Sequence, residues 1–132
     1  MDVGARLAGL DIVWANDSNK HACNTYEKNI GTHIRCGPLE QYTKEFRDLS
    51  SIDAVIGGPP CQGFSVAGKM LPTDPRSALV FAFMDAVEMV SPSFFVMENV
   101  KGLGKLSKFS RVREALFKRA INLGYDAKLI VL

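Results

Sequence analysis

One cysteine in this 132-residue chain stands in a stretch whose backbone has little freedom. Cys61 follows two consecutive prolines, and glycines stand before and after the Pro-Pro-Cys-Gln block. Each proline fixes its own φ angle and restricts the residue before it, so a stiff turn presents the thiol. Such a thiol could act as a nucleophile if its site promotes the thiolate, which is a minor form at neutral pH. The alternative is a buried structural thiol, because a free cysteine often serves as a small apolar residue.

Glu98 is a second candidate for chemistry, because it directly follows an apolar run at residues 94–97. A carboxyl group at the mouth of an apolar sheet loses hydration, which favours its protonated form and suits a general acid. The next residue, Asn99, could orient it. The pairing that this predicts is a thiol nucleophile opposite a carboxylic acid that protonates the ring under attack. The alternative is an exposed carboxylate at the start of the next helix.

A third candidate, Asp17, ends another apolar run. In nucleotide-binding α/β folds an acid in this position accepts hydrogen bonds from ribose hydroxyls. An acid that only stabilises the start of the following helix is an equally good interpretation. The two histidines, His21 and His33, fall in or beside elements where surface or structural roles are expected, which disfavours a Cys-His pair.

The elements that must position these residues alternate between strand and helix. Ser18 is expected to cap one helix, and Asp74 followed by Pro75 is expected to start another. Apolar patterns predict strands at residues 10–15, 33–35, 53–56, 93–97 and 125–132, and helices at residues 2–8, 19–30, 39–49, 75–90 and 109–123.

This alternation predicts βαβ units in an α/β fold, with an open parallel sheet and helices on its faces. Crossovers between parallel strands are nearly always right-handed. Ligands of such sheets bind beyond the carboxyl ends of the strands. The three candidates Asp17, Cys61 and Glu98 all follow predicted strands, so we expect them at one edge of one sheet.

Length and composition narrow the class of protein. The length suits a single domain, and a net charge of +2 is too small to argue for or against a nucleic-acid partner. Three cysteines without close pairing argue against a disulfide framework or a zinc site, so no metal is expected, and they favour a reducing compartment. No apolar run approaches the ~20 residues that span a membrane, and no signal peptide is recognisable. We therefore expect an intracellular protein, cytoplasmic in a bacterium.

Several motifs resemble those of the DNA cytosine-5 methyltransferases, and together they cover essentially the whole chain. Residues 58–65 (GPPCQGFS) and 95–100 (FVMENV) resemble the two best-marked catalytic motifs of that family. Residues 74–79 (DPRSAL) resemble the stretch between them, and residues 13–17 (VWAND) resemble the ribose-binding segment. The family usually has Glu where this chain has Asp17. The resemblance implies a Rossmann-like sheet of an S-adenosylmethionine-dependent methyltransferase.

The resemblance also implies a reaction. A cytosine flipped out of double-stranded DNA would be attacked at C6 by Cys61, while Glu98 would protonate N3 and contact the exocyclic amine. C5 would then take the methyl group of S-adenosylmethionine, and loss of the C5 proton would expel the thiolate. Residues 62–73 would close over the DNA, with Ser65 and Lys69 contacting phosphates. Supporting roles would fall to Pro60, Gln62, Ser65 and Asn99, and the cofactor site would be lined by Asp17, Ser18, Leu39, Pro60 and Leu79.

The chain departs from the family pattern in three ways. Residues 4–9 (GARLAG) resemble the helix that follows the family's glycine-rich cofactor loop, so the first strand and that loop are expected to be absent from this chain. The chain also stops before the family's arginine-bearing motif. Residues 37–39 (GPL) stand where the family usually has Gly-Asp-Ile. We therefore expect residues 1–132 to be one partial catalytic domain with an incomplete sheet. Such a sheet would leave edges and apolar surface uncovered, which predicts weak stability, association or a complementing polypeptide.

Two other functions stay open. The chain could be an inactive remnant or a binding subunit, since it lacks the glycine-rich loop. It could also methylate cytosine in tRNA, because a related family shares the Pro-Pro-Cys-Gln block. The Gly-Phe-Ser that follows this block is more similar to the DNA enzymes.

Overall fold

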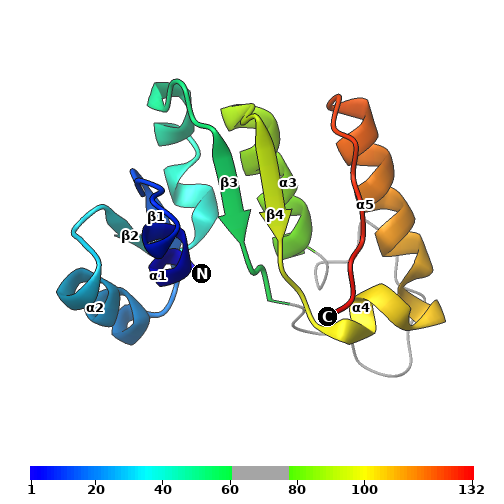
Figure 1. Cartoon of the computed structure of the whole chain (residues 1–132), viewed down its shortest axis with the longest axis horizontal. Coiled ribbons are helices and arrows are strands. Elements are labelled where there is room, and N and C mark those ends of the chain that lie inside the picture. Colours follow the sequence, from blue (N-terminus) through cyan, green and yellow to red (C-terminus); the bar gives the residue numbers. More distant parts are fainter. Residues whose placement is uncertain (61–77) are drawn as a thin grey trace. The chain divides into compact units, whose positions relative to one another are not determined.

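The computed structural model describes residues 1–60 and 78–132. The chain divides into two compact units, Met1–Leu49 and Ser50–Leu132 (Figure 1). Each unit contains one pair of parallel strands, β1 with β2 and β3 with β4. The mixed α/β architecture predicted from the sequence is confirmed. The described strands form two separate two-stranded sheets, with Asp17 on one and Glu98 after the other, so their predicted place at one edge of one sheet stays a prediction. The single domain predicted for residues 1–132 stays a prediction.

The first unit is a small βαβ arrangement. It contains α1 (Asp2–Leu7), β1 (Ala15–Asp17), α2 (Lys20–Asn29), β2 (Ile34–Cys36) and two 3₁₀ helices, Leu39–Tyr42 and Glu45–Asp48. The ladder pairs Ala15 with Ile34 and Asp17 with Cys36. Parallel pairing requires a crossover, which α2 provides.

Asn19, one residue later than predicted, caps the helix α2. Its side-chain oxygen accepts hydrogen bonds from the backbone N–H groups of His21 (2.8 Å) and Ala22 (3.2 Å). Asn19 is extended (φ −88°, ψ 116°), which is the geometry of an N-cap. The prediction that Ser18 caps this helix was wrong, because the two residues are equally suited by type and only the backbone chooses between them.

The segment at residues 39–49 forms two short 3₁₀ helices in place of the single helix that was predicted. Side-chain contacts anchor the second of them to the strands. The Glu45 carboxylate accepts hydrogen bonds from Trp14 Nε1 (3.0 Å) and Arg35 Nε (2.8 Å). Phe46 is buried and meets the Trp14 ring edge-to-face at 5.0 Å. The apolar spacing therefore marked side chains that are buried (Phe46) or partly buried, but it did not predict the type of helix.

The second unit places helices against a second parallel pair. It contains β3 (Ala54–Gly57), α3 (Ala78–Val90), β4 (Phe94–Met97), α4 (Lys101–Lys105), a 3₁₀ turn at Ser107–Phe109 and α5 (Ser110–Asn122). The ladder runs from Ala54 opposite Phe94 to Gly57 opposite Met97. Figure 1 shows β3 and β4 side by side. The predicted helix start at Asp74 and Pro75 lies outside the described residues.

The core of the second unit lies between α3, α5 and one face of β4. Phe95 and Met97 pack against buried side chains of both helices, including Phe83, Val87 and Ala120. Their neighbours Phe94 and Val96 point to the other face and stay 46% and 47% exposed. One face of this strand is thus covered within the unit, and the other still presents apolar side chains.

Two predicted strands differ in the structure. Of residues 10–15, only Ala15 joins a ladder, because the partner strand β2 begins opposite it at Ile34. Residues 125–132 join no ladder among the residues that the structure describes. Tyr125 is held instead by a hydrogen bond from its hydroxyl to the Pro92 carbonyl (2.7 Å). The prediction of a final strand was therefore wrong: the segment has the apolar pattern, but its backbone pairs with no strand among the described residues. None of the helices in the described part of the chain is long and apolar enough to cross a membrane.

Candidate active site

The carboxyl ends of β3 and β4 are joined beyond the last residues of the ladder. The Glu98 backbone N–H donates to the Gly57 carbonyl (2.9 Å), which extends the pairing by one step. The Asn99 side chain then donates from Nδ2 to the Pro59 carbonyl (2.8 Å), across a sequence separation of 40 residues. Its Oδ1 accepts from the Val100 N–H (2.9 Å). We call residues 57–60 and 97–99 the catalytic edge.

Gly57 allows the helix α3 to approach this edge closely. A Cβ atom on residue 57 would lie 2.7 Å from Cε2 and 2.8 Å from Cδ2 of Phe83, distances that real Cβ contacts do not reach. Phe83 is only 7% exposed and belongs to the core of the unit. Gly57 is therefore required by close packing, and the Phe83 ring supports the backbone that leads into the prolines.

Glu98 lies at this edge, but its side chain is exposed. The loss of hydration expected from the apolar strand is thus not provided by the described residues. Asn99, half-buried beside it, uses its amide to hold the Pro59 carbonyl. The proposed orienting of Glu98 by Asn99 stays a prediction. What the structure adds is a direct tie between the strand end that carries Glu98 and the turn that precedes Cys61.

Four predicted site residues, Cys61, Gln62, Ser65 and Lys69, lie outside the described residues. Pro60, which immediately precedes Cys61, is described and exposed at the end of the catalytic edge. The structure therefore positions the acid and the double proline, and the position of the thiol stays a prediction.

The first unit brings three of the predicted cofactor residues to the carboxyl ends of β1 and β2. Asp17 ends β1, Ser18 follows it, and Leu39 begins the first 3₁₀ helix after β2. The Asp17 carboxylate is exposed, and its Oδ1 accepts the Asn19 N–H (2.7 Å). The Asp17 carbonyl accepts from the N–H of Gly37 (3.0 Å). Pro60 and Leu79 belong to the second unit.

Asn16 is a positioning residue that the sequence analysis missed. Its Nδ2 donates to the carbonyls of Arg35 and Gly37, both at 2.9 Å, and so ties the end of β1 to the end of β2. The only signal for it was an amide side chain at the end of an apolar run, which also fits an ordinary turn.

Asp17 lines an open hollow of about 900 Å³ between side chains of α1 and α2. A carboxylate at the rim of such a hollow can accept hydrogen bonds from a diol, which fits a ribose. The other residues that line the hollow are Val3, Asn19, His21, Ala22, Thr25, Tyr26, Asn29 and Ile30.

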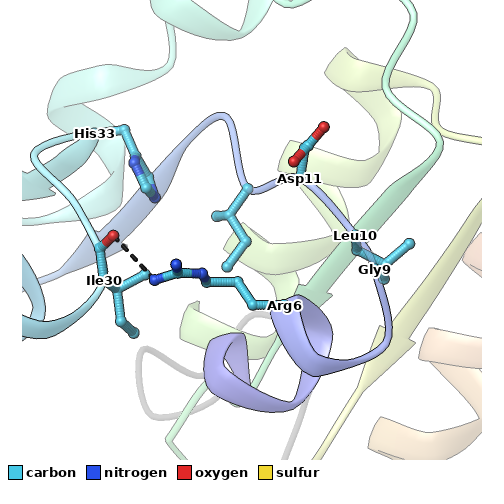
Figure 2. A pocket seen from close by; sticks show the side chains of 7 residues that line it. Arg6, Gly9, Leu10, Asp11, Ile30 and His33 are labelled. Atoms are coloured by element: carbon cyan, nitrogen blue, oxygen red, sulfur yellow. Dashed lines mark hydrogen bonds between the residues drawn. The ribbon is translucent and has the colours of Figure 1, made fainter.

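A smaller hollow of about 260 Å³ lies before the strands, beside residues that precede β1 and β2 (Figure 2). Arg6 crosses it and donates from Nη1 to the Ile30 carbonyl (3.3 Å). Asp11 and His33 also line it, and none of the predicted site residues does. Within residues 1–60 and 78–132, no group of three or more His, Cys, Asp or Glu side chains is placed to hold a metal ion.

Comparison with known proteins gives consistent matches over the whole chain. The profile of the C-5 cytosine-specific DNA methylase family matches residues 1–132. The Type II methyltransferase M.MthTI of Methanothermobacter thermautotrophicus is 38% identical over 137 residues, which cover 100% of this chain and 39% of that protein. The Type II methyltransferase M.DdeI of Desulfomicrobium norvegicum is 36% identical over 135 residues, covering 98% of this chain and 32% of its own length.

Solved structures agree with the sequence matches. A protein described as a DNA modification methyltransferase encoded within an Escherichia coli prophage superposes with a TM-score of 0.73 at 32% identity, covering 91% of this chain and 34% of that one. The Dnmt2 methyltransferase of S. pombe superposes with a TM-score of 0.66 at 24% identity, covering 91% of this chain and 38% of that one, and supports the fold alone. The chain thus spans about two fifths or less of the length of these four proteins.

Proposed function

The chain belongs to the C-5 cytosine-specific DNA methylase family, and from this premise we propose that its catalytic edge serves methyl transfer to C5 of cytosine in DNA. The observation that carries the proposal is the hydrogen bond from Asn99 to the Pro59 carbonyl. It links the two strand ends on which the family's two catalytic motifs stand. Cys61 follows Pro59 by two positions in the sequence, and Glu98 precedes Asn99.

In the proposed reaction, Cys61 is the nucleophile and Glu98 the acid. The thiolate forms a bond with C6 of a flipped-out cytosine, while Glu98 protonates N3 and so takes up the negative charge that the attack creates. C5 becomes nucleophilic and accepts a methyl group. Removal of the C5 proton then restores the double bond and expels the thiolate. Glu98 is exposed in the chain alone, so we propose that the bound base removes its hydration and promotes the protonated form.

S-adenosylmethionine supplies an electrophilic methyl group when bound. The residues at the ends of β1 and β2 fit the ribose part of this molecule, because the exposed Asp17 carboxylate lines an open hollow. Ser18 and Leu39 stand at the same strand ends and are proposed to complete this part of the site. Pro60 and Leu79 are proposed as its further contacts.

We further propose that activity requires additional segments, in the same polypeptide or in a complementing one. The relatives are about two and a half to three times as long as this chain, since it covers 39% and 32% of M.MthTI and M.DdeI. The uncovered apolar face of β4, with Phe94 and Val96, is a surface that such a segment could cover.

Covalent trapping tests the reaction. DNA that contains 5-fluorocytosine has no C5 proton to lose, so a methylated adduct to the nucleophile cannot resolve. With labelled S-adenosylmethionine and a complementing polypeptide, we expect a labelled protein–DNA adduct that Cys61→Ala abolishes. Cys36→Ser, which changes an exposed thiol outside the catalytic edge, is the matched control and should retain the adduct.

Three results would change the proposal. An adduct that survives in Cys61→Ala would exclude this thiol as the nucleophile. An adduct formed with tRNA containing 5-fluorocytosine, and not with DNA, would move the substrate to RNA. Absence of any adduct after complementation would favour a non-catalytic role for the chain.

A further inference from the structure

Two cysteines that the proposed reaction does not use lie at the carboxyl end of β1 in the first unit. Cys23, on α2, is 2% exposed, and its Sγ donates a hydrogen bond to the Asp17 carbonyl (3.2 Å). Cys36 is the ladder partner of Asp17, and the N–H of Gly37 donates to the same carbonyl (3.0 Å). Both cysteines therefore stand at the same strand end, Cys23 through its hydrogen bond to Asp17 and Cys36 through the ladder.

The two thiols differ in their access to solvent. Cys36 is exposed, whereas Cys23 is buried, and both are free. A disulfide requires Cβ atoms that lie about 4 Å apart, and rotation about each χ1 then brings the two sulfurs into bonding distance. The helix and the strand that carry them are packed in one βαβ arrangement, and both cysteines lie at the carboxyl end of β1.

We propose that Cys23 and Cys36 form a reversible intramolecular disulfide when the protein meets a hydroperoxide. In the first step the exposed Cys36 thiolate attacks the peroxide, the O–O bond breaks, and a sulfenic acid forms with release of water or an alcohol. In the second step the Cys23 sulfur attacks the Cys36 sulfur, the S–OH bond breaks, and a second water leaves. Both sulfurs are oxidised by one electron each, and the peroxide takes the two electrons. A small dithiol or thioredoxin-type reductant reverses the reaction.

The surroundings of Cys23 set the order of these steps. Burial, then the neighbouring Cys36 thiol and the Asp17 carboxylate, raise the pKa of Cys23 to about 11. Its thiolate is therefore scarce at neutral pH, and the pair stays reduced until an oxidant has activated Cys36. Once the disulfide forms, Cys23 has no S–H to donate, and the Asp17 carbonyl loses one of its two hydrogen bonds. The modification thus acts directly on the end of β1.

Peptide mapping of the full chain tests this proposal. The native protein is treated with a slight molar excess of hydrogen peroxide, free thiols are blocked with N-ethylmaleimide, and the tryptic peptides are analysed without reductant. Cleavage after Lys20, Lys28, Arg35 and Lys44 releases the two cysteines on separate peptides, 21–28 and 36–44. We expect these two peptides to appear joined, two hydrogen atoms lighter than their sum, and to separate after dithiothreitol. Cys61 should remain available for the blocking reagent.

Two variants and an unfolded control make the test decisive. In Cys23→Ser, the oxidised Cys36 has no partner and should proceed to the sulfinic acid. In Cys36→Ser, whose position is exposed, Cys23 should stay fully alkylatable after unfolding. Oxidation in urea should mix all three cysteines. The proposal is overturned if native Cys36 is oxidised while Cys23 stays reduced, or if Cys36 pairs with Cys61 or with a second molecule.

Discussion

Replacing Gly57 by alanine tests whether close packing of α3 supports the catalytic edge. The added methyl would lie 2.7 Å from Cε2 of Phe83, about 0.7 Å inside the 3.4 Å at which ordinary contact begins. Overpacking of this kind costs about 1–3 kcal/mol, whereas removing a glycine from a strand recovers about 0.5–1 kcal/mol. We expect a net loss of about 1–2 kcal/mol in the free energy of unfolding.

Urea denaturation of the second unit, followed by circular dichroism, measures this loss. The sign should reverse in a Phe83→Val background, because valine lacks both ring atoms that collide. There, Gly57→Ala should be neutral or stabilising by up to about 1 kcal/mol. Gly102→Ala is the matched control in the same unit, since its methyl would meet Leu106 and Phe109 at 3.4 and 3.7 Å, within ordinary contact. Equal destabilisation by Gly57→Ala in both backgrounds would refute the reasoning.

Three further predictions concern the polar contacts. Asn99→Ala removes the donor to the Pro59 carbonyl. Adduct formation in the trapping assay should slow about five- to tenfold, which is the equivalent of one hydrogen bond. The free energy of unfolding in urea should change by less than this equivalent. Asp17→Asn keeps an oxygen that can accept the Asn19 N–H but lacks the negative charge. Calorimetry of the complemented protein should therefore show S-adenosylmethionine binding about tenfold weaker. Unchanged binding would remove Asp17 from the site. The hydrogen bond from Trp14, and then the Arg35 guanidinium, hold the pKa of Glu45 below its usual range. Because the folded pKa is the lower one, the stability that Glu45 contributes is complete above its unfolded pKa of about 4.3 and is lost as pH falls through the folded value. Urea midpoints measured from pH 6 downward should fall less steeply in Glu45→Gln than in the wild type.

The sequence predicted the elements whose pattern is set locally. The helices α2, α3 and α5 and the strands β3 and β4 all fall where apolar spacing placed them, because each buries one stripe or one run of side chains. The short helix α4 was missed because Lys101–Lys105 has two glycines and almost no apolar stripe. The final strand was predicted wrongly because ladder formation depends on a neighbour that no local pattern reveals.

The candidate site was predictable in its residues and not in its contacts. The order of apolar runs and polar ends was enough to put Asp17 and Glu98 after strands. The tie between Asn99 and Pro59 was not predictable, because it joins residues 40 positions apart through a side chain that could equally have faced Glu98. The common location of Cys23 and Cys36 could not be predicted for the same reason. Their spacing in the sequence matches no known cysteine motif, and Cys36 reaches this strand end only because it pairs with Asp17 in the ladder.

The length of the crossover between β3 and β4 also affects the order in which the two strand pairs can form during synthesis. At about 5–20 residues per second, the 40 positions between Pro59 and Asn99 take the ribosome about 2–8 s, whereas the 19 positions between Asn16 and Arg35 take about 1–4 s. The strands β1 and β2 of the first unit can therefore pair before the residues that pair with β3 have been synthesised. A nascent chain interrupted before Asn99 would contain the complete ends of β1 and β2 and no tie between the ends of β3 and β4.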